Sequence, residues 1–131
     1  MSGKQRDVAD PWKCRFSIII KSLFVLPQRH SNWGSCAPYV ELEIGNNLKG
    51  QTHAIEASRE AIWNETVEMG VVSLDDVVLI RIRNFDPHPL DPDDTVGFAE
   101  ILVRQLLALG NCPLVLKDSS NRVLHESVLY V

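Results

Sequence analysis

The chain has 131 residues, 45% of them hydrophobic, which suits one domain with a buried core. Its 13 Lys and Arg residues against 17 Asp and Glu residues leave a formal net charge of −4, so no overall positive field favours nucleic acid as a partner. The cysteines, Cys14, Cys36 and Cys112, form neither a CxxC pair nor a disulfide-framework spacing. Their pattern favours a reducing, intracellular and therefore cytoplasmic setting.

The N-terminal part of the sequence predicts a lead-in followed by a strand. Residues 1–12 are polar and lack periodicity, so we expect a flexible lead-in there and a folded domain over residues 13–131. Apolar residues alternate within residues 12–26, as in a strand. This run is interrupted by Lys21 and is far shorter than the roughly 20 residues of a membrane span, so we expect neither a span nor a signal sequence.

A loop closed by proline leads into a predicted hairpin. Residues 39–44 alternate apolar and acidic side chains at the two-residue period of a half-buried strand. Pro38 fixes its own φ and keeps Ala37 out of the helical region, so the entry into this strand is stiff. The turn residues 45–47 and a second alternating stretch then predict a hairpin in which residues 51–57 pair with 39–44.

β-branched side chains favour strands in the middle of the chain, over residues 60–72 and 77–83. In the second of these, isoleucines are expected inward, and Arg81 and Arg83 outward. Three prolines in residues 84–94 exclude helix and sheet and predict a long acidic loop. Loops of this length in compact domains often carry function.

The C-terminal part of the chain predicts three more strands and one or two helical turns ended by a glycine. Gly97 within the first of these strands suggests a bulge or a close approach of two backbones. The fold class is therefore all-β, an eight-stranded antiparallel β-sandwich of Greek-key type. The C-terminal elements are expected over residues 95–103, 114–117 and 122–131 for the strands and 104–109 for the helix.

Three motifs resemble the C2 domain, the β-sandwich module first described as a conserved region of protein kinase C. Residues 34–40 (Gly-Ser-Cys-Ala-Pro-Tyr-Val) are similar to the family's Gly-x-Ser-Asp-Pro-Tyr-Val, residues 63–65 match its Trp-Asn-Glu, and residues 93–97 are similar to its Asp-Asp-Phe-Ile-Gly. The order and approximate spacing agree over nearly all of residues 15–131. The strand over 123–131 resembles the extra C-terminal strand of the family's permuted topology.

Members of this family often bind calcium, and then anionic lipid, through the loops at one end. Calcium needs six to eight oxygens, several from carboxylates. The resemblance assigns five positions to the calcium ligands, and two of the five carry a carboxylate. No cofactor is therefore expected, and calcium, if bound, would use Asp86, Asp93 and Asp94, in a longer third loop that also holds Asp91. The alternative is that these aspartates are solvated or form Asx turns. The resemblance places the usual aspartates at Ser31, Ala37, Asn84, Asp86 and Asp94.

A second route to membranes in the family is a basic patch on the concave sheet. The strand that would carry it has Glu41 and Glu43 where lysines are needed, and like charge repels anionic headgroups. Arg81 and Arg83 are candidates for a smaller basic binding patch. The alternative is that they form a solvated face paired with Glu41 and Glu43.

The remaining binding candidates lie in the loops. Trp33 and Leu90 are expected at the tips of facing loops, where they would wedge into lipid or anchor a protein; alternatively, Trp33 folds back over the loop base. His30 is a further candidate in the first of these loops, whereas Trp63 is expected to pack in the core or at a sheet edge.

The histidines and cysteines fit no nucleophile or metal signature, so we expect no enzyme. The function predicted is a C2-type interaction module that binds intracellular proteins or docks on membrane surfaces without calcium. The alternatives are a calcium-dependent phospholipid-binding domain and a catalytically silent part of a larger protein. The sequence indicates neither a particular partner nor an oligomeric state.

Overall fold

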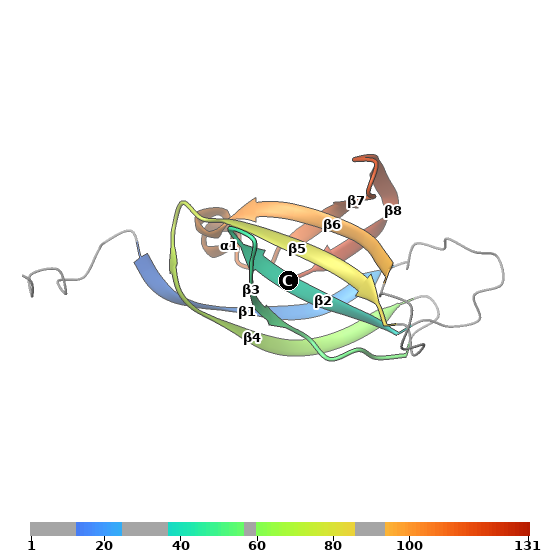
Figure 1. The fold of residues 1–131 in the computed structure, drawn as a ribbon, viewed down its shortest axis with the longest axis horizontal. Coiled ribbons are helices and arrows are strands. Elements are labelled where there is room, and N and C mark those ends of the chain that lie inside the picture. The colour runs from blue at the N-terminus through green and yellow to red at the C-terminus, as the bar shows by residue number, and fades with distance from the viewer. Residues whose placement is uncertain (1–12, 25–36, 57–59, 86–93) are drawn as a thin grey trace, which may run out of the picture.

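The computed structural model describes residues 13–24, 37–56, 60–85 and 94–131, with the backbone alone at 94, 125 and 126. This part of the chain forms eight strands and one short helix (Figure 1), which confirms the all-β prediction. The expected lead-in over residues 1–12 lies outside the described residues. The elements are β1 (Lys13–Phe24), β2 (Pro38–Ile44), β3 (Asn47–Gln51), β4 (Ala61–Ser73), β5 (Val77–Asn84), β6 (Asp94–Leu102), α1 (Val103–Leu109), β7 (Pro113–Lys117) and β8 (Val123–Tyr130).

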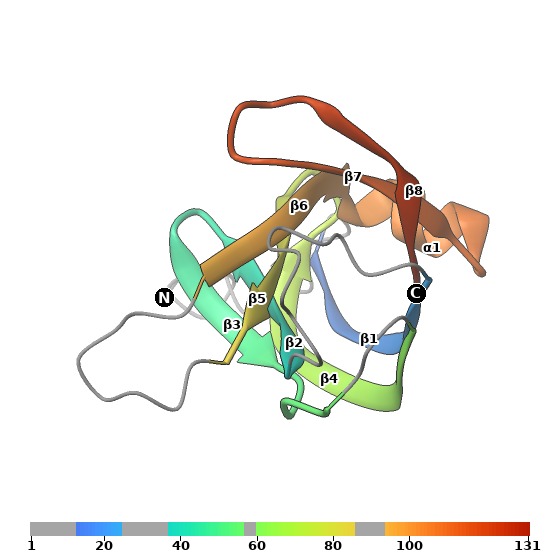
Figure 2. The same ribbon diagram turned by 90° about the vertical axis from the view of Figure 1, so that its right-hand side faces the viewer.

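The strands form one antiparallel sheet in the order β3-β2-β5-β6-β7-β8-β1-β4. The sheet folds over between β6 and β7 into two facing layers of four strands (Figures 1 and 2). Its two end strands, β3 and β4, also contact each other. The result is a nearly closed sandwich with two seams, β3 against β4 and β6 against β7.

The core lies between the layers and follows the predicted alternation. In β1, Phe16, Ile18 and Ile20 are buried while Ile19 between them is exposed. In β5, Ile80 and Ile82 are fully buried, as expected for the strand whose arginines point outward. Burying side chains of this size contributes on the order of 1.5–3 kcal/mol each, so the sandwich is a rigid frame for its loops and faces.

The hairpin was predicted correctly, but its second strand was not. β2 pairs with Asn47–Gln51, and no strand forms over the described residues of 51–57 beyond Gln51. Gly45 and Asn46 both have positive φ, 59° and 67°, which is the geometry of a two-residue hairpin turn. The chain therefore re-enters the sheet at once, and His53, predicted on a strand, lies in an irregular segment after it.

The helix begins one residue earlier than predicted, at Val103, and ends where expected. The Leu102 N–H donates to the side-chain oxygen of Gln105 at 3.1 Å, which caps the first turn. Gly110, with φ 69°, closes the last turn by donating its N–H to the Leu106 carbonyl at 3.3 Å. The Val103 N–H also donates to the Asp76 carbonyl at 2.9 Å, which anchors the helix to the turn before β5.

Two glycines occupy positions where a side chain would collide with a neighbouring strand. A Cβ at Gly97 would lie 3.0 Å from the Leu124 Cδ1 atom and 3.3 Å from the Lys117 carbonyl oxygen. The β5–β6 register also shifts beside Gly97, so both the close approach and the bulge suggested for it are present. A Cβ at Gly50 in β3 would overlap the Val67 Cγ1 methyl of β4, so this glycine lets the two end strands meet.

Candidate functional site

The fold brings together, at one end of the sandwich, positions that are distant in sequence. Pro38 pairs with Asn84, and Asn84 pairs with Asp94. The Ala37 N–H donates to the Asn84 side-chain oxygen at 2.8 Å, and the Phe85 N–H donates to the Ala37 carbonyl at 2.9 Å. Three of the positions that the C2 resemblance assigned to calcium, 37, 84 and 94, are therefore neighbours.

The chemistry of this loop end differs from that of a calcium site at the two positions whose side chains are described. Ala37 has no side-chain oxygen, and the oxygen of Asn84 is neutral and already accepts a hydrogen bond. Within the described ranges, no group of three or more His, Cys, Asp or Glu side chains is arranged to hold a metal ion. Ser31, Asp86, Asp91 and Asp93 lie outside those ranges.

The predicted loop-tip residues His30, Trp33 and Leu90 also lie outside the described residues, so their roles stay predictions. Phe85 is described at the same end of the sandwich and is half-exposed. We did not single it out from the sequence, although an aromatic residue directly after an alternating strand was a visible signal. Its exposed ring adds an apolar group beside the Ala37–Asn84 contact.

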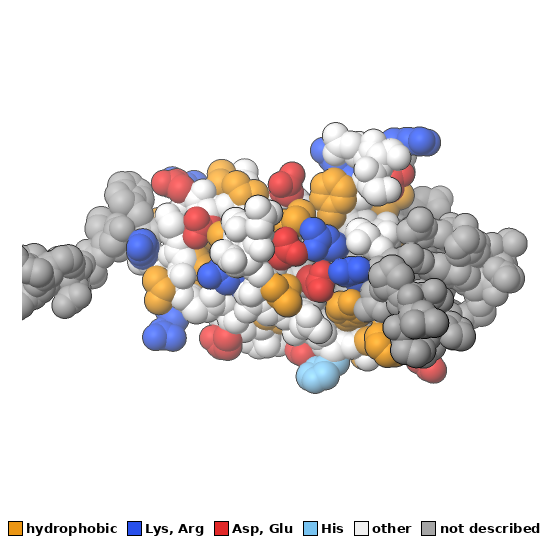
Figure 3. Space-filling model, in the orientation of Figure 1, with side chains coloured by type: hydrophobic (Ala, Val, Ile, Leu, Met, Phe, Trp, Pro, Cys, Tyr) orange, Lys and Arg blue, Asp and Glu red, His pale blue; other side chains and the backbone are white. Residues whose placement is uncertain are grey.

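Arg81 and Arg83 are paired with acidic residues on the neighbouring strand. The Arg81 Nη1 atom lies 2.6 Å from Glu43 Oε1 and 3.4 Å from Glu41 Oε1, and Arg83 Nη1 lies 3.6 Å from Glu41 Oε1. Burial lowers the pKa of Arg81, but hydrogen bonds and charge attraction from Glu43 and Glu41 outweigh it and raise the pKa overall. Positive and negative side chains adjoin over β2 and β5 in Figure 3, so this face carries balanced charge.

The segment after β3 is tied to β4 by His53. Its ring Nδ1 lies 2.8 Å from Glu65 Oε1, and its backbone N–H donates to Glu65 Oε2 at 3.1 Å. The indole N–H of Trp63 donates to the His53 carbonyl at 3.0 Å, and Trp63 packs against the core, as predicted. The ring of His53 itself is exposed, so His53 connects two segments at the protein surface.

The fold and the loop end define a β-sandwich interaction module. The family profile of the C2 domain matches residues 14–119, so the chain belongs to the C2 domain family, whose members are modules for membrane or protein binding. The resemblance seen in the three sequence motifs is thereby confirmed. No described helix has the length and apolar character needed to cross a membrane.

Solved C2 domains share the fold at low sequence identity. A C2 domain of plant Extended Synaptotagmin 1 has a TM-score of 0.68 at 12% identity, with 87% of each chain covered. BON1-C2B has a TM-score of 0.66 at 16% identity, covering 88% of this chain and 89% of that one. The calcium-bound pair of C2 domains of Extended-Synaptotagmin 2 gives 0.64 at 20%, covering 87% of this chain and 42% of that one. The comparison with curated proteins gave no match.

Proposed function

We propose that this chain is a non-catalytic C2 module that binds proteins or docks on membranes without calcium, in a cytoplasmic setting. The observation that carries the proposal is the hydrogen bond from the Ala37 N–H to the Asn84 side-chain oxygen. A neutral amide holds the base of the loop end together at a point where a calcium-binding relative would be expected to present carboxylates.

Coulomb attraction and coordination number both argue against calcium here. Calcium takes six to eight oxygens, and its affinity depends on how many of them are charged. Ala37 and Asn84 supply one neutral side-chain oxygen between them, and an ion using it would compete with a hydrogen bond worth about 0.5–1.5 kcal/mol. Asp86, Asp93 and Asp94 would then have to provide nearly all of the charge.

The charge balance of the β2–β5 face bears on how a membrane would be met. Because Glu41 and Glu43 pair with Arg81 and Arg83, this face offers anionic headgroups little net attraction. Membrane docking would therefore use the loop end, where Phe85 is exposed next to the segments that carry Trp33 and Leu90. Protein binding would be open to the other surfaces as well.

Calorimetric titration with calcium tests the proposal directly. We expect no binding midpoint in the micromolar range for the wild-type chain, and such a midpoint would establish instead the calcium-dependent rival that uses Asp86, Asp93 and Asp94. Pelleting with phosphatidylserine vesicles, with calcium or with chelator, separates the two modes of action. Binding that is equal under both conditions supports docking without calcium, and binding that appears only with calcium contradicts the proposal.

A further inference from the structure

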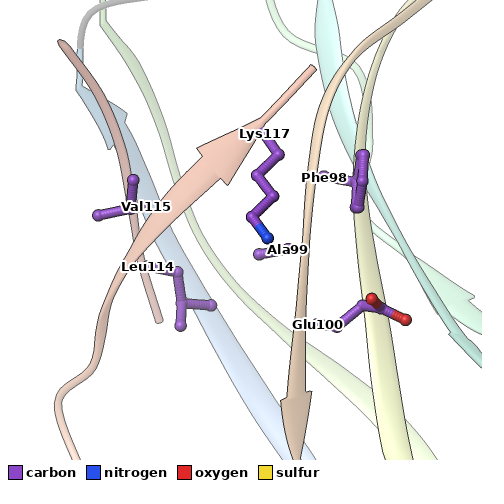
Figure 4. A pocket seen from close by; sticks show the side chains of 6 residues that line it. All are labelled: Phe98, Ala99, Glu100, Leu114, Val115 and Lys117. Carbon is purple, nitrogen blue, oxygen red and sulfur yellow. The ribbon is translucent and has the colours of Figure 1, made fainter. Parts of the chain in front are cut away.

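The two layers of the sandwich part from each other between β6 and β7. β6 pairs with β5 along nearly its whole length, from Asp94 to Leu102, but it pairs with β7 only at Phe98 and Lys117. Figure 4 shows the two strands diverging from that point. Beyond it, in the described chain, residues 99–102 of β6 have no strand partner on the side facing β7, so backbone groups along that edge are open to a further strand.

The space between the diverging strands is a hollow of about 240 Å³. A water molecule takes up about 30 Å³ of liquid, so the hollow has room for several waters or for one large apolar side chain. We call this hollow and the open β6 edge the β6–β7 cleft. Its lining residues are Phe98, Ala99, Glu100, Leu114, Val115 and Lys117 (Figure 4).

The lining of the cleft combines apolar walls with two separate charges. Leu114 and Val115 form one wall, and Val115 is 55% exposed. Lys117 reaches across the cleft toward Ala99, and Glu100 stands farther along β6 (Figure 4). Neither Lys117 nor Glu100 forms an ion pair with any described residue, so both charges are available to a ligand.

We propose that the β6–β7 cleft binds an extended peptide segment of a partner protein, which adds to the open edge of β6 as a further strand. The inference rests on the proposed function only in taking the chain to be a binding module, and it supplies the class of partner and the surface. An open strand edge is satisfied by another strand at roughly 4.7–4.9 Å, whereas a helix has no free backbone groups along its side. A lipid surface offers no such ladder either.

The register of β6 predicts which peptide sequence fits. Phe98 and Glu100 point to the outer face and Ala99 between them is buried, so an added strand presents its side chains with the same alternation. Lys117 already occupies the place opposite Phe98, so the peptide residue that meets this rung turns out of the ladder beside the Lys117 side chain and is acidic. The next residue points into the hollow and is apolar, and the third, opposite Glu100, is basic. The peptide carries this acid–apolar–base triplet in three consecutive residues.

Selection from a phage-displayed library of random heptapeptides against the wild-type chain tests the inference. We expect enrichment of the acid–apolar–base triplet, and an affinity for the synthetic peptide that falls about tenfold or more in Lys117→Glu, measured by fluorescence anisotropy. A peptide with lysine in place of the acid should regain affinity for that variant. Lys49→Glu, the same charge reversal at an exposed lysine of β3 outside the cleft, should bind the original peptide as the wild type does.

Two isomers of the peptide separate strand addition from side-chain binding. One is N-methylated at one set of alternate amides and the other at the complementary set, so that only one isomer loses the N–H groups that face β6. We expect one isomer to lose about tenfold or more in affinity and the other to bind as the parent peptide does, because only one edge of an added strand meets β6.

Three binding results would overturn the inference: no enriched triplet, equal binding to Lys117→Glu and wild type, or equal affinity of both N-methylated isomers. Elution of the wild-type chain as a dimer in size-exclusion chromatography, with the peptide unable to dissociate it, would also count against the inference, because a second copy of the chain would then cover the β6 edge. Vesicle pelleting of the same variants distinguishes this failure from that of the proposed function. If the chain pellets with vesicles without calcium but binds no peptide, only the peptide-binding proposal is rejected. A calcium-binding midpoint in the micromolar range rejects the proposed function instead.

Discussion

The hydroxyl of Thr52 accepts a hydrogen bond from the backbone N–H of Val40 at 3.0 Å, and the Thr52 N–H donates to the Val40 carbonyl at 2.9 Å. Thr52 is only 2% exposed, and its hydroxyl in turn donates to the His53 carbonyl at 3.1 Å. These bonds continue the edge of β2 beyond the end of β3. The Thr52 side chain thus supplies a hydrogen-bond partner for β2 at the point where the pairing of β2 with β3 ends.

Replacing this hydroxyl should weaken the fold. Thr52→Val keeps the shape of the side chain but leaves the buried Val40 N–H without its acceptor, which should lower the free energy of unfolding by about 1–3 kcal/mol. Urea unfolding followed by circular dichroism measures the change. Thr66→Val on the exposed face of β4 is the control and should stay within about 0.5 kcal/mol of wild type. Equal effects of the two substitutions would contradict a special role for Thr52.

The charge cluster on the β2–β5 face should contribute to stability. Arg81→Ala leaves Glu41 and Glu43, whose side chains are 13% and 18% exposed, without their nearest cation, and should cost about 1.5–3 kcal/mol. Arg122→Ala, at an exposed arginine in the turn before β8, should change the free energy of unfolding by less than about 0.5 kcal/mol.

The pH dependence of that cost follows from the raised pKa of Arg81. A cation whose pKa is higher in the folded state contributes fully below its unfolded pKa and loses its contribution only as the pH rises through the folded value. For a guanidinium both values lie in strongly alkaline solution. The difference in unfolding free energy between wild type and Arg81→Ala should therefore be the same at pH 7 and pH 9, and a fall over this range would contradict the assignment.

Carboxylates placed at the loop end should create or strengthen a calcium site. In Ala37→Asp/Asn84→Asp, the two family positions regain charge, and the new carboxylate at position 84 can still accept the bond from the backbone N–H of residue 37. We expect the calcium affinity, measured by calorimetry, to rise by about tenfold or more over wild type. Ala37→Asn with the native Asn84 adds an oxygen without charge and should give much less. If the doubly substituted chain bound calcium no better than wild type, the lack of carboxylates at positions 37 and 84 would not be what limits calcium affinity.

Cys112 should react slowly with alkylating reagents in the folded state. Its thiol is buried, and burial raises its pKa, so little thiolate is present. Iodoacetamide labelling at pH 8, followed by mass spectrometry, should modify the partly exposed Cys14 first, with Cys112 following only when the chain is unfolded in urea. Faster labelling of Cys112 than of Cys14 would contradict this order.

The raised pKa of Cys112 should also affect how the free energy of unfolding depends on pH. Because the folded state favours the neutral thiol, the contribution of this group is complete below the ordinary thiol pKa and is lost as the pH rises from that value through the folded one. Cys112→Ala, which has no ionisable group there, should lose less stability than wild type on going from neutral to alkaline solution. Parallel pH profiles for the two proteins would contradict it.

The sequence predicted best those features that depend on the alternation of single side chains. The inward isoleucines of β5 and the outward Arg81 and Arg83 follow from a period of two, and seven of the eight strands were predicted close to their observed bounds from alternation or from β-branched side chains. The misplaced strand had a readable signal as well. Gly45-Asn46 is a two-residue turn of the kind that returns the chain immediately, so pairing had to resume at Asn47 despite its weak strand propensity.

The β6–β7 cleft could not be predicted in this way. Strand patterns in β6 and β7 are equally clear, and nothing in either sequence marks Phe98 and Lys117 as the place where pairing stops. That place is set by sheet twist and by how the two layers fold over each other, which are properties of the whole sandwich. The Glu43–Arg81 contact could be predicted in part. Both side chains were expected on the outer face, but the distance between them depends on the register between β2 and β5, which the sequence did not reveal.

The missing side chain of Gly50 has a mechanical consequence. Because β3 packs directly against the Val67 side chain of β4, one flank of the molecule is closed by side-chain packing without strand pairing among the described residues, while the other flank is joined by a single rung between β6 and β7. Both flanks therefore hold the two layers together less strongly than the hydrogen-bonded ladders within each layer, and thermal separation of the layers should begin at these flanks.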